Sequence, residues 1–211
     1  MLFSKEELSR INEQLCSQSP KEIVEWVVAQ NRKTVVTTNF GPHEAAILHL
    51  VSETQVDMPV ICIDHGYNTV ETYQVAEELP RRLGLNMQIY TPRISRRYRE
   101  VNLGGVPSID ELDRHAQFTE EVKLEPFRRA FLEFRPDIWL TSIRKDQTAH
   151  RASLDIVTYD SNMQCFKVAP FFNSTELDME EYLVNHDLPI VEDYYDPTKV
   201  LGNRECGLHR S

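Results

Sequence analysis

The chain has 211 residues, 41% of them apolar, which is enough to bury the core of a single domain. Its 33 acidic residues outnumber 23 Lys and Arg, and the net charge of -10 argues against a nucleic-acid partner. The first ten residues, MLFSKEELSR, lack the long apolar stretch of a signal peptide or membrane helix, so we expect a soluble, cytoplasmic protein with no membrane partner.

Two helices are predicted at the start of the chain. Ser4 with Glu7, and Ser19 with Glu22, each have the spacing of an N-terminal capping box. Pro20 suits the first turn of the second helix, which continues through an apolar run.

From residue 33 onward, β-branched runs alternate with segments of helical periodicity. The predicted strands are 33–38, 59–64, 87–92 and 137–143, and the predicted helices are 42–53, 69–84 and 125–134. Pro42 fits the first turn of its helix, whereas Pro80 is expected to kink or end the next one. The alternation is typical of an α/β fold with one doubly wound, mainly parallel sheet and helices on both faces. The least regular stretch, Arg93 to Gln117, is expected to be a mobile excursion near the site.

Ligands of such folds bind at the carboxyl ends of the strands, and two polar loops are predicted there. Residues 37–41 place hydroxyls, an amide and free backbone N–H groups at a helix N-terminus, which favours an anion. The alternative is an ordinary strand-to-helix turn. In the second loop, Asp64 could accept a ribose hydroxyl, or it could simply form a turn with Gly66.

A third loop at a strand end, residues 142–151, brings together three of the chain's cations, including Arg144 and Arg151. Arginine forks suit phosphate or sulfate oxygens, although a solvated charged loop has the same composition. A separate cluster also suits an anion or forms a mobile surface patch; it consists of Arg93, Arg96, Arg97 and Arg99.

The cysteines are widely separated and contain no CxxC pair, so we expect no metal site and no iron–sulfur cluster; they are Cys16, Cys62, Cys165 and Cys206. Cys62 and Cys165 lie in apolar runs, where small buried side chains are expected.

Cys206 lies in a charged tail, NRECGLHRS, where neighbouring arginines and a histidine favour the nucleophilic thiolate. Gly207 would leave the chain free to swing the thiol into a pocket and out again to a reducing partner. An incidental exposed cysteine is the alternative. We therefore divide the chain into a nucleotide-binding α/β domain, residues 1–199, and a flexible tail with the reactive cysteine, residues 200–211.

Five ordered segments resemble the phosphoadenosine phosphosulfate reductase family of the adenine nucleotide alpha-hydrolase-like fold. They are TTNFG, DHGYNTVETY, KLEPFRRAF, RKDQTAHRASL and ECGLH, and they extend the resemblance from about Thr34 to His209. The last is the most specific, because it matches the family's C-terminal motif as it stands.

The resemblance implies reduction of 3′-phosphoadenylyl sulfate in sulfate assimilation and cysteine biosynthesis. Cys206 would attack the sulfonate sulfur, release adenosine 3′,5′-bisphosphate and carry an S-sulfonate, from which thioredoxin or glutaredoxin would release sulfite. The implied substrate-binding residues are Thr37, Thr38, Asn39, Phe40, Gly41, Asp64, Gly66, Lys123, Arg144, Gln147, Arg151, Glu205 and His209. Glu125 also matches. No bound cofactor is implied, the 3′-phosphate would contact the arginine cluster of residues 93–99, and the protein would be a homodimer.

The sequence departs from the family pattern in three places. Asn39 replaces a serine, His65 replaces a threonine, and between Tyr195 and Cys206 the chain has only DPTKVLGNRE where the family has a longer segment. A non-catalytic or divergent nucleotide-binding homologue is therefore the alternative function. An ATP pyrophosphatase-type adenylating enzyme would need a glycine-rich pyrophosphate loop, which residues 39–43 do not provide.

Overall fold

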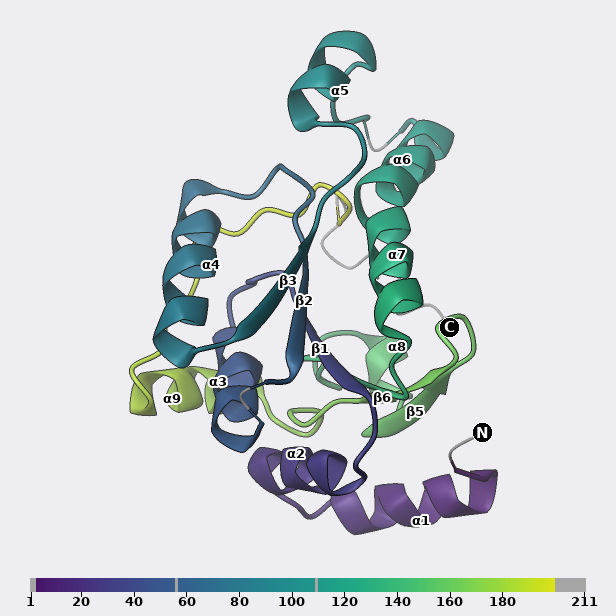
Figure 1. Cartoon of the computed structure of the whole chain (residues 1–211), viewed down its shortest axis with the longest axis vertical. Helices are drawn as coiled ribbons and strands as arrows, with labels where there is room; N and C mark the ends of the chain where they lie inside the picture. The colour runs from purple at the N-terminus through teal and green to yellow at the C-terminus, as the bar shows by residue number, and fades with distance from the viewer. Residues whose placement is uncertain (1–2, 56, 109, 200–211) are drawn as a thin grey trace.

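The structure is a computed structural model that describes residues 3–55, 57–108 and 110–199. Its centre is one six-stranded sheet (Figure 1). The strands are β1 (Thr34–Thr38), β2 (Pro59–Ile63), β3 (Asn86–Tyr90), β4 (Ile138–Leu140), β5 (Val157–Asp160) and β6 (Cys165–Val168). They lie in the order β3-β2-β1-β4-β6-β5, and every neighbouring pair is parallel except the β5–β6 hairpin. The predicted mainly parallel α/β fold is confirmed.

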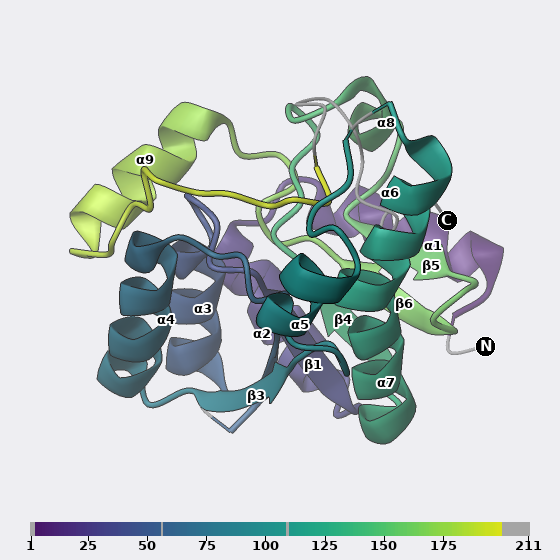
Figure 2. The ribbon, with the colours of Figure 1, turned by 90° about the horizontal axis from the view of Figure 1, so that it is seen from above.

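Helices cover both faces of this sheet (Figures 1 and 2). They are α1 (Lys5–Leu15), α2 (Pro20–Ala29), α3 (Ala45–Thr54), α4 (Val70–Leu83), α5 (Arg96–Asn102), α6 (Leu112–Thr119), α7 (Glu125–Phe134), α8 (Ala149–Ala152) and α9 (Glu176–Asn185). A π-helical segment, η1 (Glu120–Leu124), joins α6 to α7 in one continuous column. Among the residues described, no helix is both long and apolar enough to span a bilayer.

The core is divided into two parts by the sheet, because successive side chains of a strand point to opposite faces. Val36 of β1 packs with α2, α3 and α4 on one face, whereas its neighbour Val35 packs with Phe127 and Phe131 of α7 on the other. Trp139 of β4 belongs to the α7 side and contacts both phenylalanine rings. The carboxyl ends of the central strands lie at the edge between these two layers, which is where folds of this type bind ligands.

The capping boxes predicted at Ser4 and Ser19 are both present, and α1 and α2 begin at the next residue. Helix α3 begins at Ala45 rather than at Pro42, because residues 42–44 form turns that bring the Glu44 side chain back to β1. The prediction that α4 ends early is wrong: the helix runs through Pro80 to Leu83 and ends at left-handed Gly84, whose N–H donates to the Pro80 carbonyl.

The stretch Arg93 to Gln117 is less irregular than expected, since it contains all of α5 and most of α6. The polar, arginine-rich sequence of α5 hides its helical period. The periodicity of the sequence also does not reveal α9, the four-residue helix α8 or the four-residue strands β5 and β6. Runs of four residues carry too little pattern to separate a strand from a loop.

Candidate active site

A solvent-open cleft of about 740 Å³ lies at the carboxyl ends of β1, β2 and β4. The strand order reverses at β1, since β2 and β3 lie on one side of it and β4 on the other, and such switch points are where open α/β sheets bind ligands. The predicted site residues that line this cleft are Thr37, Thr38, Asn39, Lys123, Gln147 and Arg151. The fold therefore brings together three segments that lie far apart in the sequence.

Other predicted residues are not part of this lining. Phe40, Gly41, Asp64, Gly66 and Arg144 lie in the same loops but are not among the residues that line the cleft. The remaining ones, Glu205, Cys206 and His209, lie outside the described residues.

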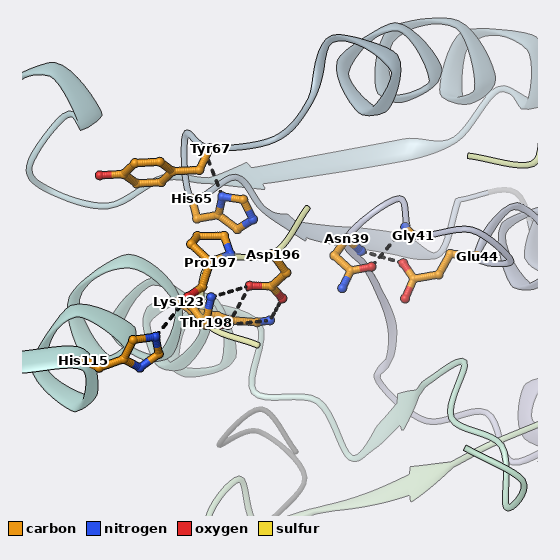
Figure 3. Close-up of polar contacts among 10 residues, drawn as sticks. All are labelled: Asn39, Gly41, Glu44, His65, Tyr67, His115, Lys123, Asp196, Pro197 and Thr198. Atoms are coloured by element: carbon orange, nitrogen blue, oxygen red, sulfur yellow. Dashed lines mark hydrogen bonds and ion pairs between the residues drawn. The ribbon is translucent and has the colours of Figure 1, made fainter. Parts of the chain in front are cut away.

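The first loop does not offer the free backbone N–H groups that the sequence suggested. The Asn39 N–H donates to Glu44 Oε2 at 2.6 Å, and the Gly41 N–H donates to Asn39 Oδ1 at 3.1 Å (Figure 3). The Phe40 N–H donates to Thr38 Oγ1 at 3.0 Å. Phe40 is buried and has a left-handed φ of 51°, so the turn is tightly held. The N–H groups of this turn are therefore already hydrogen-bonded, and an anion could bind them only by displacing one of their present acceptors.

Glu44 is the residue that organises this loop, and the sequence analysis did not identify it. Its Oε2 accepts hydrogen bonds from Thr38 Oγ1 at 2.7 Å and from the Asn39 N–H, and its Oε1 accepts one from Ser142 Oγ at 2.9 Å. The carboxylate thus ties the end of β1 to the loop after β4, which are the two sides of the cleft. A negative charge in the lining also directs an anionic group towards the cations elsewhere in the cleft.

In the second loop, Asp64 forms the turn and His65 lines the cleft. Asp64 Oδ1 accepts from the Gly66 N–H at 2.8 Å, and Gly66 has a φ of 82° that suits glycine. His65 is buried, and its Nδ1 accepts from the Tyr67 N–H at 3.0 Å. Burial lowers the pKa of His65 to about 4, so the imidazole is neutral at pH 7. The cleft therefore gains a polar but uncharged ring here.

The third loop separates its two arginines. Arg151 lines the cleft and donates to Gln147 Oε1. Arg144 is buried; its Nε donates to Asp146 Oδ1 at 3.0 Å, and its Nη1 lies 3.3 Å from His43 Nδ1. Arg144 braces the loop, whereas Arg151 can face a ligand.

Lys123 reaches the cleft from η1, and a π-helical turn often marks a functional site because it redirects a side chain. Its Nζ lies 2.5 Å from Asp196 Oδ2 and 3.3 Å from Thr198 Oγ1 (Figure 3). Burial alone would raise the pKa of Asp196, but the Lys123 ammonium and the Thr198 hydroxyl outweigh it and hold the pKa of this carboxyl below its usual value. The Asp196 carboxyl is thus ionised at neutral pH.

Further contacts hold the segment that follows α9, residues 186–199, in place. After α9 this chain crosses the carboxyl edge, as Figure 2 shows in a view onto that edge. The Thr69 hydroxyl donates to the Asp193 carbonyl at 2.6 Å, and His115 Nε2 lies 3.1 Å from the Pro197 carbonyl (Figure 3). Lys199 then lines the cleft. The last described residues therefore lie at the site itself.

Among the described residues three cysteines are free, and two are unsuited to nucleophilic chemistry. Cys62 and Cys165 are buried as predicted, and burial raises the pKa of each thiol to about 12. Cys16 is exposed at the end of α1 and is not part of the cleft.

Sequence reasoning did not place Glu44, Asp196 or Lys199 in the site, and it treated His65 only as a departure from a motif. Glu44 and His65 follow strand ends, so their position after a predicted strand is a usable signal. Asp196 and Lys199 carry no such signal, since irregular chain surrounds them.

Comparisons with known proteins agree with this geometry. Residues 33–208 match the sequence model of the phosphoadenosine phosphosulfate reductase domain. A phosphoadenosine 5′-phosphosulfate reductase of Synechococcus is 36% identical over 183 residues, covering 86% of this chain and 78% of that protein. One from Xanthomonas euvesicatoria is 32% identical over 232 residues, covering 97% and 93%.

Solved structures give the same answer for the fold. The phosphoadenylyl-sulfate reductase of Candida auris, in a phosphate complex, superposes with a TM-score of 0.78 at 25% identity and covers 90% of each chain. An FMN adenylyltransferase of Candida glabrata, with a TM-score of 0.56 at 16% identity over 76% of this chain and 50% of its own, shares the fold alone. With a matching domain, an α/β sheet of the adenine nucleotide alpha-hydrolase-like type and relatives that are reductases, this chain belongs to the phosphoadenosine phosphosulfate reductase family.

Proposed function

We propose that this chain reduces 3′-phosphoadenylyl sulfate to sulfite and adenosine 3′,5′-bisphosphate, with Cys206 as the nucleophile. The observation that carries the proposal is the position of Lys199, which lines the cleft only seven residues before Cys206. Seven residues span at most about 25 Å when extended, which is ample to deliver a thiol into a cleft that begins at the first of them.

The reaction has two steps. The Cys206 thiolate attacks the sulfonate sulfur, the bond from that sulfur to the bridging phosphate oxygen breaks, and the bisphosphate leaves with the electron pair. Thioredoxin or glutaredoxin then supplies a dithiol, whose first thiolate attacks the Cys206 sulfur and expels sulfite. Its second thiol resolves the mixed disulfide, so the partner is oxidised to a disulfide and the Cys206 thiol is restored.

The cations of the cleft suit the charge that develops on the leaving phosphate. Lys123, Arg151 and Lys199 approach from three different segments, and fixed positive charges aimed at a developing anion lower the transition-state energy more than the ground-state energy. His65 is neutral and Glu44 is braced by three donors, so neither competes for these cations as a mobile charge.

The predicted substrate-binding set keeps its place in this proposal, with two kinds of role. Thr37, Thr38, Asn39, Gln147 and Arg151 are proposed to contact the nucleotide with Lys123. Outside this lining, Phe40, Gly41, Asp64, Gly66 and Arg144 are proposed to hold the loops in shape. Glu205 and His209 are proposed to act beside Cys206. We also propose sulfate assimilation in the cytoplasm as the setting and a homodimer as the assembly.

The test is to mix the reduced full chain with 3′-phosphoadenylyl sulfate and to look for a sulfonate on Cys206 by mass spectrometry of its peptides. We expect one adduct per chain, which disappears when reduced thioredoxin is added while sulfite appears. Nucleotide binding without an adduct would contradict the proposal and would favour a non-catalytic homologue. An adduct on Cys16 instead would identify Cys16 as the nucleophile.

A further inference from the structure

A second pocket, which is open to solvent and has a volume of about 440 Å³, lies between α5 and α6, apart from the cleft described above; we call it the Arg99 cavity. Figure 1 shows α5 standing at the far end of the molecule beside α6. The residues that matter in its lining are Arg99, Gly105, Arg114, Phe118 and Glu121. None of them lines the cleft in which the reaction is proposed to take place.

Arg99 is a buried cation with unused hydrogen-bond donors. Its side chain is only 5% exposed, and its Nη1 donates to Glu121 Oε2 at 2.5 Å. Its Nε and Nη2 have no hydrogen-bond partner among the described residues. The guanidinium carbon lies 5.6 Å from the centre of the Phe118 ring, which covers one face and accepts no N–H bond in the guanidinium plane. A buried polar group without a hydrogen-bond partner destabilises the protein, so a ligand that accepts a hydrogen bond from it is favoured.

One further cation lies nearby. Arg114 lines the same pocket and is 53% exposed; its Nη1 donates to Glu111 Oε1 and its Nη2 to the Leu103 carbonyl at 3.4 Å. Tyr67 packs edge-on against Phe118 with 5.6 Å between ring centres, but it is not among the residues that line this pocket.

The other arginines of the sequence cluster do not share this state. Arg93 bonds Glu125 at 3.0 Å, and Arg96 and Arg97 both pair with Glu100 on the surface of α5. Their side chains are between 51% and 85% exposed, so water accepts hydrogen bonds from the N–H groups that the carboxylates do not reach. Of the four arginines predicted to contact an anion, Arg99 is thus the one that is buried and has donors with no partner among the described residues.

We propose that the Arg99 cavity binds a small oxyanion of the phosphate or sulfate type. One oxyanion can accept from Arg99 Nε and Nη2 together, because a guanidinium edge matches two oxygens of such a group. Glu121 pairs with Arg99 and Glu111 pairs with Arg114, so the attraction for an oxyanion rests on the two open donors of Arg99 rather than on an excess of positive charge. The oxyanion is either free in solution or the 3′-phosphate of the nucleotide, and the second source rests on the proposed function. Glu121, which lines this pocket, and Lys123, which lines the cleft, lie two residues apart on η1.

The experiment compares Arg99→Gln with Arg97→Gln, a matched control on the same helix whose side chain is 85% exposed. The dissociation constants of AMP and of adenosine 3′,5′-bisphosphate are measured by calorimetry for the full chain and both variants. In parallel, the melting temperature is measured while the concentration of inorganic phosphate is raised from zero to 5 mM at constant ionic strength. This phosphate concentration is too low to strengthen apolar burial through a general salt effect.

Two results support the site and identify its source. If Arg99→Gln loses roughly tenfold to a hundredfold in affinity for the bisphosphate but keeps its affinity for AMP, the 3′-phosphate is the ligand. If both nucleotides bind as before but phosphate no longer raises the melting temperature, the ligand is a free oxyanion. Arg97→Gln should behave as the unmodified chain in each assay.

If neither the bisphosphate preference nor the phosphate effect depends on Arg99, the cavity holds water and the proposal is overturned. Should Arg99→Gln not fold, Arg114→Gln is measured in its place, because that side chain is 53% exposed and lines the same cavity. Failure of the proposed function looks different: neither nucleotide would bind the unmodified chain, while phosphate would still raise its melting temperature.

Discussion

Lys123 of η1 and Asp196, 73 residues later, form an ion pair whose side chains are only 6% and 2% exposed. The pair joins the column α6–η1–α7 to the chain that leads towards Cys206. Because Lys123 also lines the cleft, this contact joins the lining of the site to the segment that ends at Lys199.

Removing one partner of this pair should destabilise the fold. Asp196→Asn leaves the Lys123 ammonium buried without its counter-charge, and we expect the free energy of unfolding to fall by about 3 kcal/mol. Urea denaturation at pH 7 measures the loss. Asp193→Asn, an exposed acid on the same segment, is the control and should change stability little. Equal stability of the two variants would show that the ion pair contributes nothing.

The buried imidazole of His65 predicts a pH dependence of stability. Its pKa is about 4 in the folded chain and 6.5 in its ordinary range, so between these values the unfolded chain binds a proton that the folded chain does not. Stability from this group is complete above about pH 6.5 and is lost as the pH falls towards 4, by up to about 3 kcal/mol. Denaturation at pH 7 and pH 5 should show a smaller drop for His65→Gln than for the unmodified chain. An identical drop would mean that His65 titrates normally.

The two arginines of the third loop should fail in different ways. Arg151→Ala removes a cation from the cleft, so we expect affinity for adenosine 3′,5′-bisphosphate to fall about tenfold with little change in stability. Arg144→Ala removes a buried brace, so stability should fall by about 2 kcal/mol and binding should weaken as the loop loosens. Calorimetry and urea denaturation separate the two effects. Lys145→Ala, an exposed cation of the same loop, is the control. Identical losses in both arginine variants would contradict this division of roles.

Cys206 should be the thiol on which sulfite release depends. Cys206→Ser is expected to abolish thioredoxin-coupled sulfite release, because a hydroxyl at neutral pH is a far weaker nucleophile than a thiolate. Cys16→Ser is the matched control, since Cys16 is exposed but stands outside the cleft. Its rate of sulfite release should equal that of the unmodified chain. A comparable loss in both variants would mean that the assay responds to thiols in general.

Much of the fold was readable from the sequence because its signals are local. A capping box at Ser4 or Ser19 depends on residues three positions apart, β1 is a continuous β-branched run, and β2 is an apolar run. Segments whose pattern is short or polar were missed, such as the β5–β6 hairpin and α9. Pro80 misled because the neighbouring contacts of α4, which buries Leu79 and Pro80, outweigh the local cost of a proline.

By itself, the sequence determined the alternation of strands and helices, the three polar strand ends and the family motifs, since each of these resides in neighbouring residues. Only the tertiary structure decided what those polar groups bind. The N–H groups of residues 39–41 are taken up by the loop itself and by Glu44, and Lys123 meets an acid from the other end of the chain. Hydrogen bonds and ion pairs between distant segments follow from how the layers pack, and no local pattern records that packing.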